Sequence, residues 1–261
     1  MNTNVSFVVQ GPEVPMITRN LFSSINIFYP YAETIFSTWA SSEIPCNRII
    51  INDDPGDSQG TNQKNLNRFL YSSQKGCEAA SHPLIIRLRS DLNLFSNGLQ
   101  IFLDQFHELD GAVGTPKDRK GYRTVSNRII MGSVYTVDPA GSFKLPFHIS
   151  DWWHLGNRND LLNLYNIPFA SLETCGNTKY RNEQYIWIKF LQKHGFNVNI
   201  KFDEDNSKEN IQATYESIID NCFIIDNYKA GIINSKYPEI NNYHPALLSS
   251  QKFLQLCTIF T

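Results

Sequence analysis

The sequence predicts an α/β fold with a mostly parallel, Rossmann-like sheet flanked by helices. Four short apolar runs predict strands, and stretches of helical periodicity separate them. The runs are apolar on both faces, which is typical of parallel strands that are covered by helices on both sides. The predicted strands are residues 5–10, 33–38, 48–52 and 84–89.

Two helices are expected between these strands. The first carries an apolar face at helical spacing and ends before Pro30, and the second covers residues 62–80. The apolar face of the first helix comprises Ile17, Leu21, Ile25 and Phe28.

The second half of the chain mixes strands and helices. Strands are predicted at 111–116, 125–138 and 196–202, and helices at 157–165, 183–194 and about 208–221. The apolar final segment, 247–260, is interpreted as a last core helix or strand, although it could also lie on a membrane surface.

The composition excludes several classes of protein. A net charge of −2 provides no strong basic field for nucleic acid. The five cysteines are scattered without paired spacing, which favours reduced thiols in a cytosolic protein. The sequence shows neither a signal peptide nor an apolar run of about 18 residues. A soluble, cytoplasmic protein is therefore expected.

Polar or small residues follow each of the first four predicted strands. They are Gln10-Gly11, Thr38-Trp39, Asp53-Asp54 and Ser90-Asp91. Ligands of parallel α/β sheets bind at the carboxyl ends of the strands, so these residues predict a binding site. The alternative is that each of them forms a simple turn.

Charged residues around the fourth strand suggest how a diphosphate could be held. Asp91 is a candidate metal ligand, and Arg68 and Arg89 are candidate phosphate clamps. Alternatively, Asp91 caps the turn while Arg87 and Arg89 pair with surface carboxylates.

The segment 65–91 resembles a pattern of GT-A glycosyltransferases. In those enzymes an Arg-Asn pair on a helix is followed by glycine, an apolar strand and an Asp-x-Asp motif. Here the pair is inverted, as Asn67-Arg68, and Arg89 stands in place of the first aspartate. A cation at Arg89 could partly substitute for metal charge, which puts metal dependence in question.

A series of motifs narrows this resemblance to one family. Together with the Asn67-Arg68 helix and in this order, they resemble the WavE family of bacterial lipopolysaccharide-synthesis proteins over roughly residues 5–190. The motifs are SFVVQGP (6–12), FSTW (36–39), NDDPG (52–56), RLRSD (87–91), ISDWWHLGNRNDL (149–161) and NEQYIWI (182–188).

The resemblance implies a GT-A-like fold and a glycosyltransferase that builds surface polysaccharide. The donor would be a nucleotide sugar, and the acceptor a hydroxyl of a surface glycan or lipid-linked precursor. A divalent cation, Mn²⁺ or Mg²⁺, would bind at Asp91. The enzyme would work in the cytoplasm, in peripheral contact with the inner face of the membrane.

The same resemblance assigns parts of one domain. Residues 1–110 would form the nucleotide-binding half, 111–200 the acceptor and catalytic half, and 201–261 a C-terminal α/β extension. The expected nucleotide- and donor-binding residues are Gln10, Gly11, Thr38, Trp39, Asp53, Asp54, Asn67, Arg68 and Arg89.

Asp151 is followed by Trp152, Trp153 and His154. Indole rings stack on the apolar faces of sugars, and carboxylates bind sugar hydroxyls, so these residues are expected to hold the acceptor or donor sugar. The alternative is that both tryptophans are core residues and that Asp151 caps a turn.

Glu183 opens a predicted helix and is the favoured general base. A helix N-terminus keeps a carboxylate ionised, and many inverting GT-A enzymes place their base there. Asp151 competes for this role. Alternatively, Glu183 is a first-turn glutamate that only stabilises the helix and has no catalytic role.

Two rival functions remain at this point. A non-catalytic nucleotide- or glycan-binding protein would keep the strand ends and tryptophans without needing a base. A sugar nucleotidyltransferase would need a glycine-rich basic loop after the first strand, and QGPEVPMITR (10–19) is too acidic and too poor in glycine for that.

Overall fold

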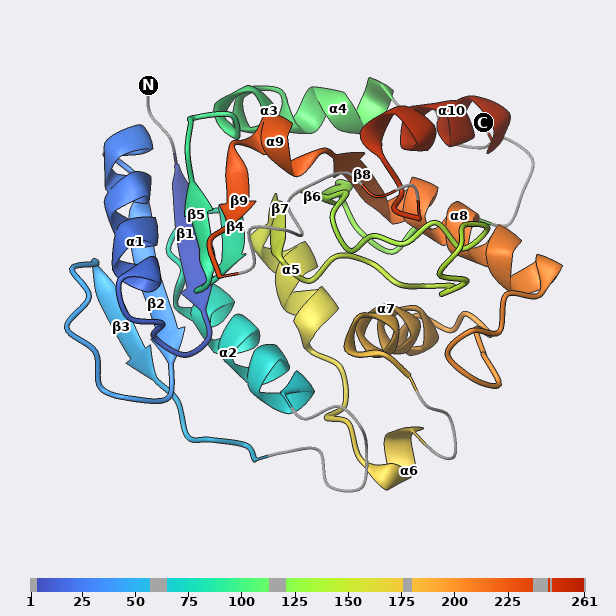
Figure 1. Ribbon diagram of the computed structural model, residues 1–261, viewed down its shortest axis with the longest axis horizontal. Coiled ribbons are helices and arrows are strands. Elements are labelled where there is room, and N and C mark those ends of the chain that lie inside the picture. The colour runs from blue at the N-terminus through green and yellow to red at the C-terminus, as the bar shows by residue number, and fades with distance from the viewer. Residues whose placement is uncertain are drawn as a thin grey trace.

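The computed structural model describes residues 4–56, 65–112, 121–175, 180–236, 244 and 246–260. Among these residues, seven strands form a sheet in the order β3-β2-β1-β4-β7-β6-β8 (Figure 1). Its strand pairs are parallel except those of β7, which runs antiparallel to β4 and to β6. The predicted α/β class with a mostly parallel sheet is therefore confirmed.

The bounds of β1 to β4 follow the first four predicted apolar runs closely. A separate antiparallel pair is formed by β5 (Leu92–Leu94) and β9 (Ile232–Asn234). The strands of the main sheet are β1 (Val5–Gln10), β2 (Glu33–Thr38), β3 (Arg48–Ile51), β4 (Leu84–Arg89), β6 (Ile129–Gly132), β7 (Trp153–Asn157) and β8 (Cys222–Ile225).

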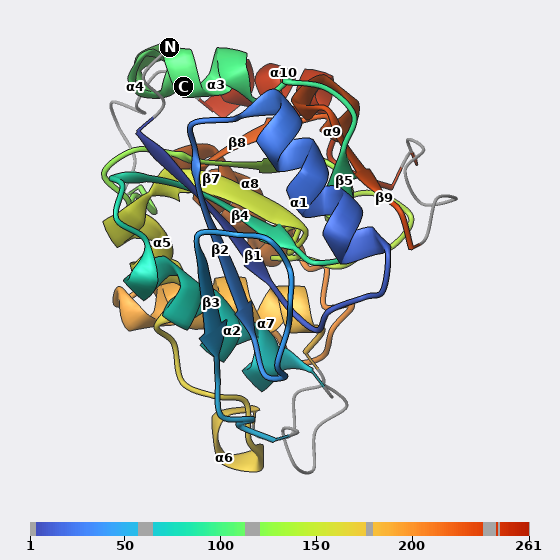
Figure 2. The same cartoon turned by 90° about the vertical axis from the view of Figure 1, so that its left-hand side faces the viewer.

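Helices cover both faces of the sheet (Figures 1 and 2). Alternate residues of β1 point to opposite faces: Val5, Phe7 and Val9 pack in the core with α1, and Val8 packs in the core with α2. The helices are α1 (Ile17–Phe28), α2 (Leu66–Ala79), α3 (Gln100–Asp104), α4 (Phe106–Ala112), α5 (Arg158–Tyr165), α6 (Leu172–Cys175), α7 (Asn182–Lys193), α8 (Lys208–Asn221), α9 (Asn227–Ala230) and α10 (Ser250–Phe260).

The C-terminal part of the chain completes the sheet. Strand β8 pairs with β6 and is an edge strand of the main sheet, and β9 pairs with β5. The apolar final segment forms α10, which buries Phe253. Residues beyond 200 are thus part of the same α/β architecture as the first half.

Three predicted strands differ from the structure. The strand predicted at 196–202 is wrong: Val198 and Ile200 are buried, which explains the strand-like pattern, but the Val198 amide bonds to the Phe196 carbonyl within the same segment. Of 125–138, only Ile129–Gly132 is a strand. Residues 111 and 112 end α4, and 113–116 lie outside the described residues.

Helix α2 approaches the sheet closely because Gly76 has no side chain. A Cβ atom there would collide with Cγ1 of Val8 and lie 3.2 Å from Cβ of Ser37. This contact brings the C-terminal half of α2 close to β1 and β2.

We predict that Gly76→Ala lowers the free energy of unfolding by about 1–3 kcal/mol, because the new methyl group overpacks the helix–sheet contact. Gly111→Ala is the matched control, since it also lies in a helix but a Cβ there meets nothing within 4 Å. Urea denaturation measures both. Equal effects of the two substitutions would contradict the close contact at Gly76.

Candidate active site

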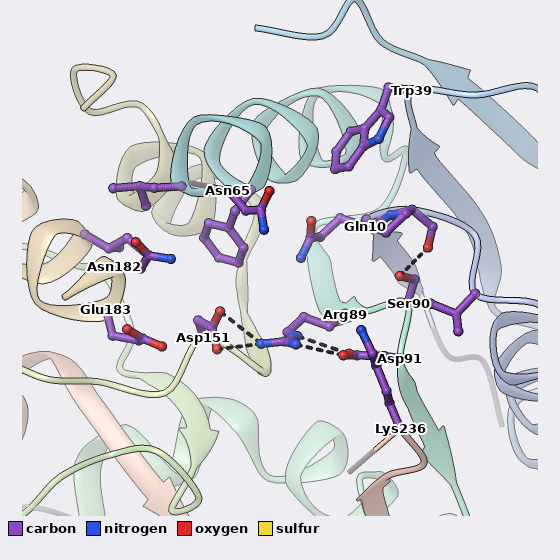
Figure 3. Close-up of a pocket in the computed structure, with 16 residues that line it drawn as sticks. Gln10, Trp39, Asn65, Arg89, Ser90, Asp91, Asp151, Asn182, Glu183 and Lys236 are labelled. Carbon is purple, nitrogen blue, oxygen red and sulfur yellow. Dashed lines mark hydrogen bonds and ion pairs between the residues drawn. The ribbon is translucent and has the colours of Figure 1, made fainter. Parts of the chain in front are cut away.

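A cavity of about 300 Å³ opens at the carboxyl ends of β1 and β4 (Figure 3). Turns after the strands, the start of α2 and the start of α7 contribute to its wall. The lining residues are Gln10, Gly11, Pro12, Val14, Trp39, Asn65, Leu66, Phe69, Arg89, Ser90, Asp91, Asp151, Asn182, Glu183, Ile186 and Lys236. The cavity thus lies where the strand-end rule predicts a ligand site.

Arg89 lies at the centre of the charged wall, between two carboxylates (Figure 3). Its Nη2 and Nε donate to Asp91 at 2.7 and 3.1 Å, and its Nη1 lies 3.3 Å from each carboxylate oxygen of Asp151. Burial disfavours the charged guanidinium, but the carboxylates of Asp151 and Asp91 outweigh it and raise the pKa of Arg89. Arg89 therefore stays protonated and holds both carboxylates in place.

A second arginine fixes the backbone of the same wall. Arg87 is fully buried, and its guanidinium donates to the carbonyl oxygens of Asp151 and Trp152 at 2.6 and 3.3 Å. It also lies over the ring of Phe69, with 4.8 Å from Cζ to the ring centroid. Asp151 is thus held through its carbonyl by Arg87 and through its carboxylate by Arg89.

Glu183 points into the cavity from the first turn of α7 (Figure 3). Its side chain is 18% exposed, and Oε2 lies 3.5 Å from Nε2 of His148. Burial raises the pKa of Glu183 above the usual 4.5; Asp151 adds to this effect, while His148 and Arg89 oppose it. A carboxylate with a raised pKa beside a cavity is a candidate general base.

Gly11 allows two strand ends to meet. Its φ of +123° favours glycine, and a Cβ atom there would lie 2.7 Å from Oγ of Ser90. Ser90 in turn donates to the carbonyl oxygen of Pro12 at 2.7 Å. The turns after β1 and β4 therefore form one continuous wall of the cavity.

The opposite wall is less charged. Trp39 is half-buried at the cavity rim, and Gln10 and Asn65 carry amide groups nearby (Figure 3). The amide oxygen of Gln10 lies 2.9 Å from the Ser72 hydroxyl, which limits how that side chain turns. A flat ring with neighbouring amides suits a nucleobase or a sugar.

The donor set does not fit a divalent cation held by the protein. Both oxygens of Asp91 already accept hydrogen bonds from Arg89. No group of three His, Cys, Asp or Glu side chains arranged for a metal occurs in the described part of the chain. A Mg²⁺ or Ca²⁺ ion prefers several oxygen ligands, so Asp91 in this position is a partner of Arg89.

A family model of WavE lipopolysaccharide synthesis matches residues 5–256, nearly the whole chain. The protein belongs to the WavE family. It is therefore involved in lipopolysaccharide synthesis, as the sequence motifs predicted. A comparison with curated proteins gave no significant match. Within the described ranges of this WavE protein, no helix has both the length and the apolarity of a membrane span.

The cavity of this WavE protein brings together several residues that the sequence predicted for a site. They come from three strand ends and two distant segments, and they surround one space. They are Gln10, Gly11, Trp39, Arg89, Asp91, Asp151 and Glu183.

Other predicted donor residues lie outside the cavity wall. Thr38 is buried below it, and Asn67 bonds to the backbone of Ala170 at 2.8 and 3.2 Å. Arg68 forms an ion pair with Asp54 at 2.8 Å, while Asp53 is exposed to solvent. The predicted phosphate clamp at Arg68 is thus engaged with a neighbouring carboxylate in this structure.

The expectation that Trp152, Trp153 and His154 hold a sugar is corrected by their burial. The two tryptophans are 2% and 0% exposed, and stacking on a sugar requires an accessible ring face. His154 is fully buried between Arg87, Tyr165 and the Ser150 carbonyl. Burial and the Arg87 guanidinium hold the pKa of His154 well below its usual range.

Sequence reasoning missed several residues of the wall. Asn182 lies next to Glu183 in the NEQYIWI motif, and Asn65 and Phe69 lie at the start of α2, so their positions could have been inferred. Lys236 has no comparable signal: it reaches the cavity because β9 pairs with β5, and the Ser235 amide donates to the Asp91 carbonyl at 3.2 Å.

We predict that Arg89→Met creates a metal site. Without the guanidinium, Asp91 and Asp151 lose their shared cation, so Mn²⁺ should raise the melting temperature of the variant by at least about 2 °C. The wild-type protein should show no shift with Mn²⁺ alone. Arg19→Met, at an exposed position of α1, is the control. An equal shift in the wild-type protein would mean that Asp91 already binds metal.

We also predict that ionisation of Glu183 lowers the free energy of unfolding of the wild-type protein as the pH rises. Because the folded-state pKa is raised, the unfolded chain releases its proton near pH 4.5 while the folded chain retains it. Glu183→Gln should therefore match the wild-type protein at low pH and become more stable than it above about pH 4.5. Urea unfolding between pH 4 and 8 measures this difference.

Glu209→Gln is the matched control for that experiment. Glu209 also occupies the first turn of a helix, α8, but is exposed. A stability difference that grows equally with pH for both variants would show that burial of Glu183 is not its cause.

Proposed function

We propose that this WavE protein is a glycosyltransferase that uses a nucleotide-sugar donor. The observation that carries the proposal is the partly buried Glu183 carboxylate, which shares a cavity at the carboxyl ends of β1 and β4 with Arg89 and its two carboxylate partners. The cavity combines a candidate base, two cationic side chains, amides and aromatic rings within one space. A sugar transfer with a diphosphate leaving group uses such groups: a base for the acceptor, cations for the leaving group, and contacts that orient the donor.

The donor is assigned to the side of the cavity formed by the strand ends. Trp39 would stack on the nucleobase, with Gln10 and Asn65 beside it. Arg89 and Lys236, the cationic side chains among the described lining residues, would face the diphosphate. In this assignment Arg89 takes the position expected of the divalent cation, Mn²⁺ or Mg²⁺.

The acceptor is assigned to the side formed by α7. Glu183 would take the proton of the acceptor hydroxyl, and the resulting oxygen would attack the anomeric carbon of the donor. The bond between that carbon and the phosphate oxygen breaks, and its electron pair leaves with the nucleoside diphosphate. Asp151 is the weaker candidate for the base, because Arg89 engages both of its oxygens.

Involvement in lipopolysaccharide synthesis suggests the kind of acceptor. We assign it to a hydroxyl of a surface glycan or of a lipid-linked precursor. Such a precursor would be reached by peripheral contact at the inner face of the membrane, from the cytoplasm.

The first experiment is a melting-temperature titration with nucleoside diphosphates and nucleotide sugars. A ligand at 100 times its Kd adds about 2.7 kcal/mol to the stability, which identifies the donor class. If no nucleoside diphosphate or nucleotide sugar raised the melting temperature, the assignment of the strand ends to a nucleotide donor would be contradicted.

With the donor known, we predict that Glu183→Gln lowers turnover by about 10²–10⁴-fold and leaves the donor-induced melting shift in place. Release of nucleoside diphosphate measures turnover, and Glu209→Gln is the control. Full activity of Glu183→Gln would exclude it as the base. A donor-binding wild-type protein without turnover on any acceptor would favour the alternative, a non-catalytic nucleotide- or glycan-binding protein.

A further inference from the structure

His148 is a buried residue that contacts Glu183. Its side chain is 6% exposed, and each ring nitrogen faces an oxygen atom: Nε2 lies 3.5 Å from Oε2 of Glu183, and Nδ1 lies 2.9 Å from the carbonyl oxygen of Tyr135. His148 does not line the cavity, but Glu183, which it contacts, does.

Both partners of the His148 ring are hydrogen-bond acceptors when Glu183 is ionised. A carbonyl oxygen only accepts, so the Nδ1 atom must carry a proton. An ionised carboxylate also only accepts, so it is matched by a proton on Nε2. The ring that satisfies both partners is the imidazolium, which carries a positive charge next to the carboxylate.

The backbone around His148 holds this arrangement in place. Tyr135 has a φ of +65°, which is rare for a residue with a side chain, and its carbonyl is the one that meets the His148 ring. The His148 carbonyl accepts from the Val137 amide at 2.9 Å, and the Thr136 hydroxyl accepts from the Ser150 amide at 3.0 Å. A strained backbone position thus directs an oxygen atom at the ring.

We propose that His148 is a positioning residue for Glu183: its ring forms an ion pair with Oε2, favours the ionised carboxylate and leaves Oε1 for the acceptor hydroxyl. This inference rests on the proposed function above. In the transfer step the acceptor O–H bond breaks and its proton goes to Oε1 of Glu183. The acceptor oxygen bonds to the anomeric carbon, the nucleoside diphosphate leaves with the electron pair, and His148 keeps its proton throughout.

The charged groups that face Glu183 come from two segments, the stretch between β6 and β7 and the end of β4. They are His148 in the segment between β6 and β7, Asp151 just before β7, and Arg89 at the end of β4. Burial and Asp151 raise the pKa of Glu183, and His148 and Arg89 lower it. Removing the charge of His148 therefore shifts the balance toward the protonated, inactive carboxyl.

The test is a ¹³C NMR titration of the Glu183 carboxyl carbon in the wild-type protein and in His148→Gln. Glutamine can still donate a hydrogen bond but carries no charge, so the Glu183 midpoint should move up by about one pH unit. His107→Gln, at an exposed position, is the control and should leave the midpoint unchanged. An unchanged midpoint in His148→Gln would overturn the proposal.

A second measurement covers the case in which His148→Gln does not fold. In the wild-type protein, ¹⁵N NMR of the His148 ring at a pH where Glu183 is ionised should show protons on both ring nitrogens. A ring that lacks the proton on Nδ1 or on Nε2 would overturn the proposal without any substitution.

The pH profile of turnover separates positioning from a purely structural role. Below the midpoint, His148→Gln should reduce kcat about tenfold, and activity should return as the pH rises. In the Glu183→Gln background the same substitution should have no further effect. A loss that is constant with pH would overturn the proposal. If His148→Gln shifts the Glu183 midpoint but the wild-type protein shows no turnover, the proposed function would be refuted and the His148–Glu183 ion pair would still hold.

Discussion

Two arginines of β4 hold the candidate site together. Arg87 and Arg89 are two residues apart, so they project from the same face of the strand. The first is buried and binds the backbone at Asp151, and the second reaches the cavity and binds the Asp151 carboxylate. If these contacts were lost, β7 could keep its hydrogen bonds to β4 and β6 while the segment before it moved, and Glu183 would face a different electrostatic environment.

The position of the site could be predicted from the sequence because it follows from topology. Parallel strands end at one edge, so polar residues after β1, β2 and β4 had to lie near one another. Gln10 is the register partner of Arg89, which brings the first and fourth strand ends directly together. Asp53, at the edge strand β3, is exposed and lies outside the cavity wall, since the same rule places it at the margin of the sheet.

The roles of individual side chains were harder to predict, because a motif does not reveal which face is buried. Trp152 and Trp153 have the composition of a sugar-binding surface, yet they enter a central strand that is covered on both sides. His148 carried no signal, since its proposed role rests on a contact with Glu183 across 35 residues of sequence. Such contacts depend on the path of irregular segments, which periodicity does not describe.

The direction of strand β7 decides which part of the chain lines the cavity beside β4. Because β7 runs antiparallel to its neighbours, its start rather than its end lies towards the cavity. The irregular stretch between β6 and β7 therefore supplies the lining residue Asp151. That stretch supplies both His148 and Asp151. Its length can change without altering the strand order, so under the proposed function acceptor preference could diversify while the proposed donor side of the cavity stays constant.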